Sequence, residues 1–225
     1  MSDLKAESDK YILVDIFCHG CPSLKLWDKY LEKIKEQKNI DRFDLISFRS
    51  KTHGWHEYCF DFVKGAQHFS SSKYNDAFHE IFFGKDAMNE ACYDCITRST
   101  VVKTDIRMGD FWGGRYDLDT KGVSAVIISS EKGKELFDSV AHKFYFDRAD
   151  FNEIISAQSY KKAHNLDNNR RNSVLSLLSG DEGIDTVVRK HRRMLSFKTN
   201  VKRNLKSILK HLPDSIYLRL KKKLR

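Results

Sequence analysis

Residues Lys10–Ser23, KYILVDIFCHGCPS, decide how the fold is interpreted. The nearly continuous apolar run at 10–17 is typical of a buried strand. Cys18 and Cys21 follow it, at the carboxyl end of the strand, where open α/β sheets bind their ligands. Ser23 is a suitable N-cap, and apolar residues recur at helical spacing beyond it. We therefore predict an amphipathic helix over residues 24–37.

Strand and helix patterns alternate through the rest of the chain. We predict strands at 44–49, 55–63, 105–113 and 123–128, and helices at 75–84, 130–141 and 150–162. The serines at 70–72 predict a loop. Helical, basic sequence continues from Gly183 to the end and is broken at Pro213. The predicted fold class is α/β (α+β), a mixed sheet flanked by helices with a basic C-terminal helical tail.

Charge is distributed unevenly along the 225 residues. Residues 189–225 contain fourteen Lys or Arg and one acid, whereas residues 1–188 contain 26 basic and 30 acidic residues. We therefore predict a domain at 1–188 and a basic amphipathic tail at 189–225. This division argues against a specific nucleic-acid-binding fold and confines any polyanion contact to the tail.

Two interpretations of the tail remain open. It is either a solvated surface or a segment that binds anionic lipid, because apolar residues alternate with lysines and arginines in it. The chain shows no secretory signal and no apolar run of membrane-spanning length. We expect a cytoplasmic protein, or one peripheral to the inner face of the membrane.

The cysteines fall into two clusters. Cys92 and Cys95 have the i, i+3 spacing of metal ligands, and Cys18 and Cys21 have the same spacing. All four are predicted metal ligands, and iron and zinc both remain open. The 70 residues between the pairs disfavour a compact zinc ribbon. Cys59, among aromatic residues, is expected to be a small buried side chain.

The segment Met108–Gly114, MGDFWGG, combines glycines with a carboxylate and two large rings. Glycines allow a flat ring or a phosphate to lie close to the backbone. The alternative is a tight corner around a buried Trp112. Residues 119–124 could add backbone amides and a hydroxyl for a phosphate, although a hairpin turn is the default there.

Five motifs in this order resemble the C-terminal domain of the coenzyme F420 hydrogenase/dehydrogenase beta-subunit family over about residues 10–175. They are Asp15–Ser23, Ser47–Trp55, Cys92–Cys95, Thr104–Gly113 and Gly122–Ser124. The resemblance implies an iron–sulfur and flavin oxidoreductase module. Such a module passes electrons between a cluster, FAD and the deazaflavin coenzyme F420.

The resemblance also implies roles for individual residues. Cys18, Cys92 and Cys95 match cysteines that resemble ligands of an iron–sulfur cluster, a 4Fe-4S cluster by this comparison, and Cys21 could replace a missing thiolate. A segment that resembles a flavin-binding region is matched by Asp105, Gly109, Asp110 and Gly113. Trp112, Gly122 and Ser124 complete the predicted cofactor-binding set.

Two family features are missing: an N-terminal ferredoxin-like stretch and a Pro-Cys motif before the first strand. The chain therefore resembles a truncated or split member that would need a ferredoxin-like or hydrogenase/dehydrogenase subunit as partner. Relatives of this type resemble proteins of surface-polysaccharide gene clusters. No catalytic side chain is predicted, and activity without the missing half is left open.

Two hypotheses of different classes follow. The first is an electron-transfer module with an iron–sulfur cluster and a flavin. The second is a non-catalytic accessory or remnant protein with a structural zinc or an empty thiol site, and with a tail that binds a membrane surface.

Overall fold

The computed structural model describes residues 10–73, 76–99, 104–158, 164, 166–209 and 220. The chain divides into two compact units. Unit 1 contains residues 1–19 and 94–163, and unit 2 contains residues 20–93 and 164–225. The chain thus passes from one unit to the other between Cys18 and Cys21, and again between Cys92 and Cys95.

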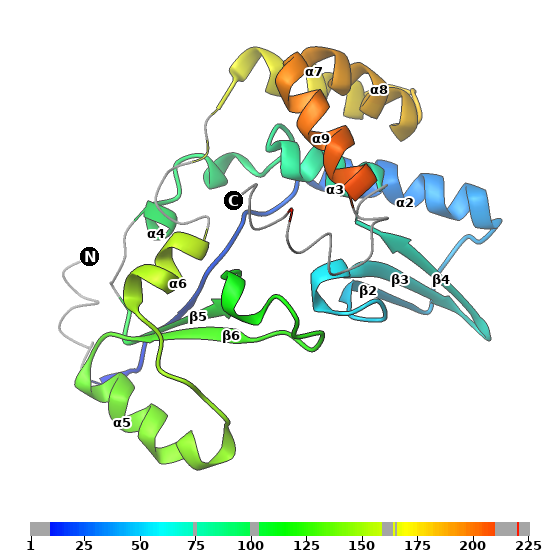
Figure 1. Ribbon diagram of the computed structural model, residues 1–225. Helices are drawn as coiled ribbons and strands as arrows, with labels where there is room; N and C mark the ends of the chain where they lie inside the picture. The colour runs from blue at the N-terminus through cyan, green and yellow to red at the C-terminus, as the bar shows by residue number, and fades with distance from the viewer. Residues whose placement is uncertain are drawn as a thin grey trace. The chain divides into compact units, whose positions relative to one another are not determined.

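Unit 1 is built on a three-stranded mixed sheet. Its order is β1 (Val14–Ile16), β5 (Ile106–Asp110), β6 (Ser124–Ile128), with β1 parallel to β5 and β6 antiparallel. Helices α5 (Glu131–Val140) and α6 (Phe151–Ala157) lie on opposite faces of β5 and β6 (Figure 1). The core on the α6 side comprises Phe111, Ala125, Ile127, Ile154 and Ile155.

The first strand differs from its prediction. It spans three residues instead of the predicted run at 10–17, and the side chains of Val14 and Ile16 are 52% and 61% exposed. The prediction of a buried strand is therefore wrong. The physical reason is position, because β1 is the edge strand of its sheet and pairs with β5 alone among the described strands.

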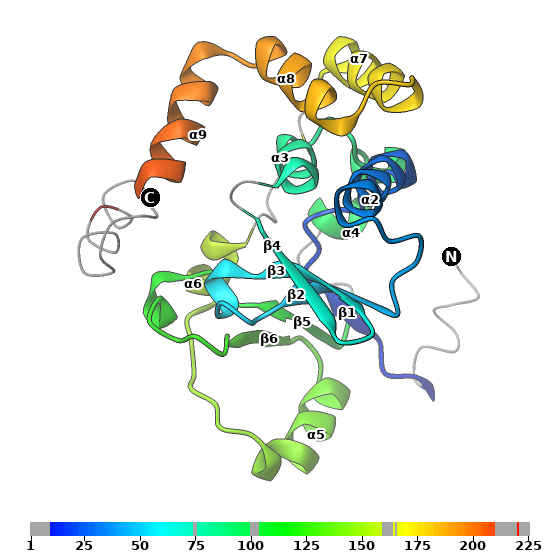
Figure 2. The same cartoon turned by 90° about the vertical axis from the view of Figure 1, so that its right-hand side faces the viewer.

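Unit 2 contains an antiparallel sheet and most of the helices. The sheet order is β2 (Leu45–Ser50), β3 (Cys59–Lys64), β4 (Gln67–Ser72). The helices, shown in Figure 2, are α2 (Leu24–Lys38), α3 (Ala77–Gly84), α7 (Asn168–Ser179), α8 (Ile184–Met194) and α9 (Phe197–Leu209). One core joins α2, α3, α7, α8 and the sheet, and Leu26, Tyr30, Phe60, Phe78 and Val187 are among its buried residues.

The helix predicted after Ser23 is confirmed. The Ser23 Oγ accepts a hydrogen bond from the Leu26 amide at 3.3 Å, which satisfies a backbone donor at the start of α2. Leu26, Tyr30 and Ile34 are buried at the predicted helical spacing. Asn39 adopts the left-handed conformation and ends the helix.

The serines predicted as a loop instead belong to β4, so that prediction is wrong. Each hydroxyl donates to a carboxylate in unit 2, which removes the cost of placing three polar side chains in a strand. Ser70 bonds to Asp61 at 2.5 Å, Ser71 to Asp76 at 2.7 Å and Ser72 to Glu57 at 3.1 Å.

Helix α7 was not predicted from sequence, whereas the predicted helical character after Gly183 is confirmed in α8 and α9. The predicted domain boundary between residues 188 and 189 falls within α8, whose Val188 and His191 are buried. The division at that position stays a prediction. The break at Pro213 and residues 159–162 lie outside the described residues. Within the described chain, no helix has the length and apolar content needed to cross a membrane.

Candidate thiolate centre and flavin segment

Unit 2 brings together one cysteine from each cluster. The Cys21 amide donates a hydrogen bond to the Cys92 Sγ at 3.2 Å, although the residues are 71 positions apart. Backbone bonds from Ser23 to Ala87 and from Asn89 to Cys21, both 2.8 Å, hold the two segments side by side. Asn89 also caps the short 3-10 helix η3 (Glu90–Cys92), on which Cys92 is the last residue. This pairing fixes Cys92 against the Cys21 backbone.

Unit 1 contains the other two cysteines of the predicted set. Buried Arg98 donates to the carbonyl oxygens of Cys18 at 3.0 Å and His19 at 3.1 Å. The Arg98 amide bonds to the Cys95 carbonyl at 3.1 Å. One arginine therefore joins the Cys18 loop to the Cys95 loop.

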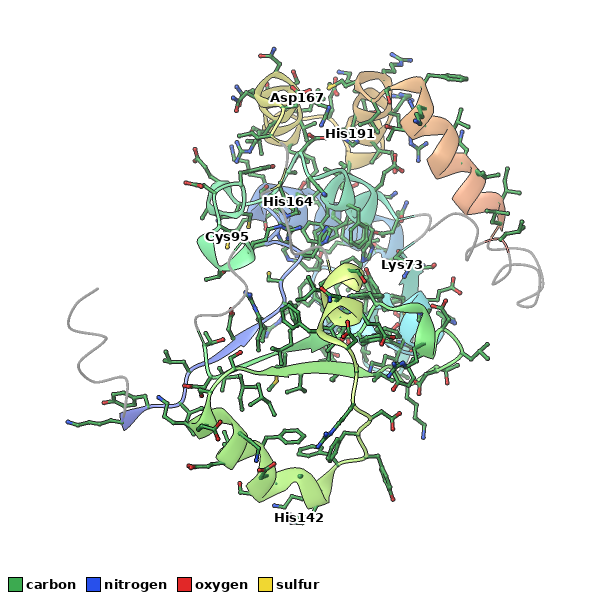
Figure 3. The ribbon with its side chains drawn as sticks, turned by 60° about the vertical axis from the view of Figure 1, so that its left-hand side comes forward. Lys73, Cys95, His142, His164, Asp167 and His191 are labelled. Carbon is green, nitrogen blue, oxygen red and sulfur yellow. The ribbon has the colours of Figure 1, made fainter. Side chains whose placement is uncertain are left out.

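The Cys95 thiol, labelled in Figure 3, lies directly before the short helix α4 (Ile96–Ser99). Its Sγ is 3.1 Å from the Thr97 hydroxyl. That hydroxyl is the main reason that the Cys95 pKa lies below its ordinary value; the backbone amides of Arg98 and Thr97 and the positive charge of Arg98 also lower it, against a smaller opposing effect of burial. A lower pKa favours the thiolate, which is the form that binds metal.

Across the described ranges, no group of three or more His, Cys, Asp or Glu side chains converges as a ready site for a single ion. Cys59, as predicted, is fully buried, and burial raises the pKa of its thiol. Its Sγ contacts Asp61 at 3.4 Å within the hairpin, so Cys59 is not a candidate metal ligand.

Asp105, which was predicted to bind a cofactor, forms hydrogen bonds and an ion pair with other residues of unit 1. Its carboxylate accepts from the Leu13 amide at 2.7 Å and from the Ser130 hydroxyl at 2.5 Å, and Lys132 lies at 3.5 Å. The Leu13 bond is the main reason that the Asp105 pKa is lowered. These contacts tie β1 to the start of α5.

Gly109 and Gly113 accommodate aromatic rings of the chain itself. A Cβ on Gly109 would lie 2.9 Å from the Phe17 Cβ, and a Cβ on Gly113 would collide with the ring of Phe111. Both glycines therefore allow close packing in unit 1. Whether they also approach a flavin stays a prediction.

Asp110, Gly122 and Ser124 lie at one end of the β5–β6 hairpin, and Trp112, which follows β5, is half-buried. Asp110 pairs directly with Ser124, and the Phe111 amide bonds to the Val123 carbonyl at 2.8 Å. The amides of Lys121 and Gly122 both donate to the Asp119 carboxylate at 2.7 Å. Those two amides thus serve an internal turn, which is the default interpretation of this segment.

The family model that describes the C terminus of the beta subunit in coenzyme F420 hydrogenase/dehydrogenase matches residues 2–153. The chain belongs to this family. No curated protein and no solved structure matches it. The resemblance predicted from the sequence is confirmed, although the matched range ends before the predicted residue 175.

This beta-subunit family match includes all four thiols and the whole predicted flavin segment, and it leaves α7, α8 and α9 outside. Two arginines inside the matched range were not predicted to matter. Arg98 joins the unit 1 thiol loops, and buried Arg107 on β5 pairs with Asp15 at 2.8 Å and also donates to the Thr97 carbonyl. The sequence offered one signal for each arginine: Arg98 follows shortly after a Cys-x-x-Cys, and Arg107 lies within an apolar strand.

His164, labelled in Figure 3, lies outside the family match and was also not predicted. Its buried ring stands edge-on to Tyr93, with centroids 6.5 Å apart. Its Nε2 is 3.6 Å from the position that a Cβ on Gly20 would occupy. Within unit 2, this ring contacts the neighbours of both Cys21 and Cys92.

Proposed function

We propose that this chain is an electron-transfer module of the oxidoreductase type that binds an iron–sulfur cluster, with Cys21 and Cys92 of unit 2 among its ligands. One observation carries the proposal. The fold brings the Cys92 sulfur, from the second cysteine cluster, into hydrogen-bond contact with the backbone of Cys21, from the first. A shared cluster requires thiols from both segments to lie close together, and this contact brings the two segments together.

The local chemistry fits such a cluster. A backbone amide directed at a ligand sulfur stabilises negative charge on it, and such bonds tune the potential of bound clusters. The lowered pKa of Cys95 favours a ligating thiolate. The guanidinium of Arg98 adds positive charge close to the Cys18 and Cys95 loops. When bound, the cluster would supply one-electron transfer, and the chain's own residues would orient and electrostatically stabilise its ligands.

For the flavin we propose FAD, with coenzyme F420 as a further electron carrier, near the β5–β6 hairpin end. Asp110 and Ser124 are opposed there, and both lie in the segment that the family match covers. The family description names a beta subunit, which supports a second subunit as the electron donor or acceptor. A role linked to surface-polysaccharide synthesis is proposed on the resemblance alone.

The competing function is an accessory protein with zinc or an empty thiol site. Anaerobic purification followed by iron, acid-labile sulfide, zinc and flavin analysis separates the two. Iron and sulfide in equal amounts with cluster absorption support the module. One zinc per chain, or thiols that remain empty after reconstitution, would favour the accessory protein.

A further inference from the structure

Helix α9 presents an apolar face that the described part of the protein does not cover. Phe197, Val201, Leu205 and Ile208 recur at helical spacing and lie on one side of the helix. Their side chains are between 43% and 83% exposed. A soluble surface helix normally directs such a stripe toward its own core, so this face is available to another surface.

The structure separates the basic tail into two parts with different roles. Helix α8 is part of unit 2, because Val187, Val188 and His191 are buried there. Two of its cations are paired with acids of the same unit: Arg192 lies 2.6 Å from Glu80, and Lys190 lies 2.5 Å from Glu182. Helix α8 therefore packs into unit 2, and two of its four Lys or Arg side chains form ion pairs there.

Helix α9 follows α8 along the chain but runs in a different direction (Figure 2). The Asn200 amide group donates to the carbonyl of Arg192 at 2.9 Å, and the Ser196 hydroxyl accepts from the Thr199 amide at 3.2 Å. These bonds begin a new helix after residue 196. Its thirteen residues contain four Lys or Arg and no acid.

We propose that α9 docks the protein onto an anionic lipid surface, with its apolar stripe in the headgroup–acyl boundary and its cations at the phosphates. A basic amphipathic helix without acids has the charge and shape for this binding mode. A protein partner or a second copy fits less well, because helix pairs use acidic as well as basic flanking residues to set their partner. Residues 195–225, which follow α8, contain ten Lys or Arg and one acid, and this charge adds long-range attraction to such a surface.

The test is vesicle co-sedimentation of the full chain. Phosphatidylcholine vesicles are compared with vesicles that contain phosphatidylglycerol as well, at low and high salt. We expect binding to the anionic vesicles only, and weaker binding at high salt because exposed charges are screened. The double variant Val201→Asn/Leu205→Asn should reduce binding at least about tenfold. Lys198→Glu should reduce it by about fivefold or more.

The matched control is Leu118→Asn, because Leu118 is 80% exposed on a turn of unit 1. This variant should bind vesicles as the unchanged protein does. Circular dichroism of each variant confirms that the fold persists, which is expected because the substituted side chains are exposed. Deletion from residue 189 is a poor test, since it removes buried His191 from unit 2.

Three outcomes would overturn the proposal: no sedimentation of the unchanged protein with anionic vesicles, equal binding by the Val201/Leu205 variant, or equal loss in the Leu118 control. A concentration-dependent dimer that the Val201/Leu205 variant dissolves, without lipid binding, would assign the face to a second copy. The lipid readout needs no metal or flavin, so it succeeds or fails independently of the redox function.

Discussion

Asp86 offers the sharpest test of how unit 2 is held together. Its nearly buried carboxylate accepts from His191 Nε2 at 2.9 Å and from Arg170 Nε at 2.8 Å. His191, on α8, is fully buried, whereas the Arg170 side chain is a quarter exposed. The replacement Asp86→Asn keeps the shape and removes the charge, so it isolates the electrostatic contribution of the group.

The magnitude follows from the exposure of the two partners. A hydrogen bond to a charged group contributes about 1.5–3 kcal/mol, and the full value applies to His191. The Arg170 bond is discounted to about 1 kcal/mol or less, because water reaches that side chain. We therefore expect Asp86→Asn to lower the free energy of unfolding by about 3 kcal/mol, near the low end for a broken buried pair.

The assay is urea unfolding followed by tryptophan fluorescence, since Trp27 and Trp55 both lie in unit 2. With a slope of about 2 kcal/mol per molar, the midpoint should fall by about 1.5 M. Glu182→Gln is the matched control, because Glu182 pairs with Lys190, the neighbour of His191, at an exposed site. The control should cost less than about 1 kcal/mol. Equal effects of the two variants would refute the argument from burial.

The pH dependence gives a second readout. Burial alone would raise the pKa of Asp86, but hydrogen bonds from His191 and Arg170 hold it below its ordinary value. A carboxyl with a depressed folded-state pKa stabilises the protein above its unfolded pKa of about 4 and loses that contribution as the pH falls. The stability difference between the unchanged protein and Asp86→Asn should therefore be constant above about pH 5 and shrink below about pH 4.

Three further predictions concern single contacts. Gly84→Ala should lower the free energy of unfolding by about 1–3 kcal/mol, because the new Cβ would lie 2.8 Å from the Cε1 of buried His191. Gly180→Ala is the control in the same urea assay, because the nearest contact of its new Cβ is at 3.7 Å. Thr97→Val should raise the pKa of Cys95, so that site-resolved alkylation of metal-free protein requires higher pH, and Thr97→Ser should not. Ser130→Ala should lower the free energy of unfolding by about 1–3 kcal/mol, because it uncaps α5 and removes the hydrogen bond from the Ser130 hydroxyl to Asp105; an unchanged thermal unfolding midpoint would contradict both contacts.

Local signals were sufficient where they did not depend on distant neighbours. Helix α2 was predictable because Ser23 supplies its cap and Leu26, Tyr30 and Ile34 mark its buried face. Strand β4 was not, because its serines are satisfied by carboxylates from other elements. The apolar run at 10–17 suggested burial, but the position of β1 at a sheet edge is a property of the topology.

The candidate site shows the same limit. Residue types and spacing predicted the four thiols as metal ligands, and the family match covers all four positions, but their role as ligands stays a prediction. The Cys-x-x-Cys spacing suggested that the cysteines act as sequence pairs. The structure instead joins Cys21 to Cys92, and links Cys18 to Cys95 through Arg98. Such cross-pairing depends on backbone contacts between segments that are about 70 residues apart, which no local pattern records.

The most direct test of the proposed redox function is the iron content of single cysteine variants after anaerobic reconstitution. Cys21→Ser and Cys92→Ser should each lose most of the iron and sulfide, because the proposed centre needs thiolates from both cysteine pairs of the sequence. Cys59→Ser should retain the full amount, because its thiol is buried in the hairpin of unit 2. Retention of iron by either of the first two variants, or equal loss in all three, would contradict a shared centre.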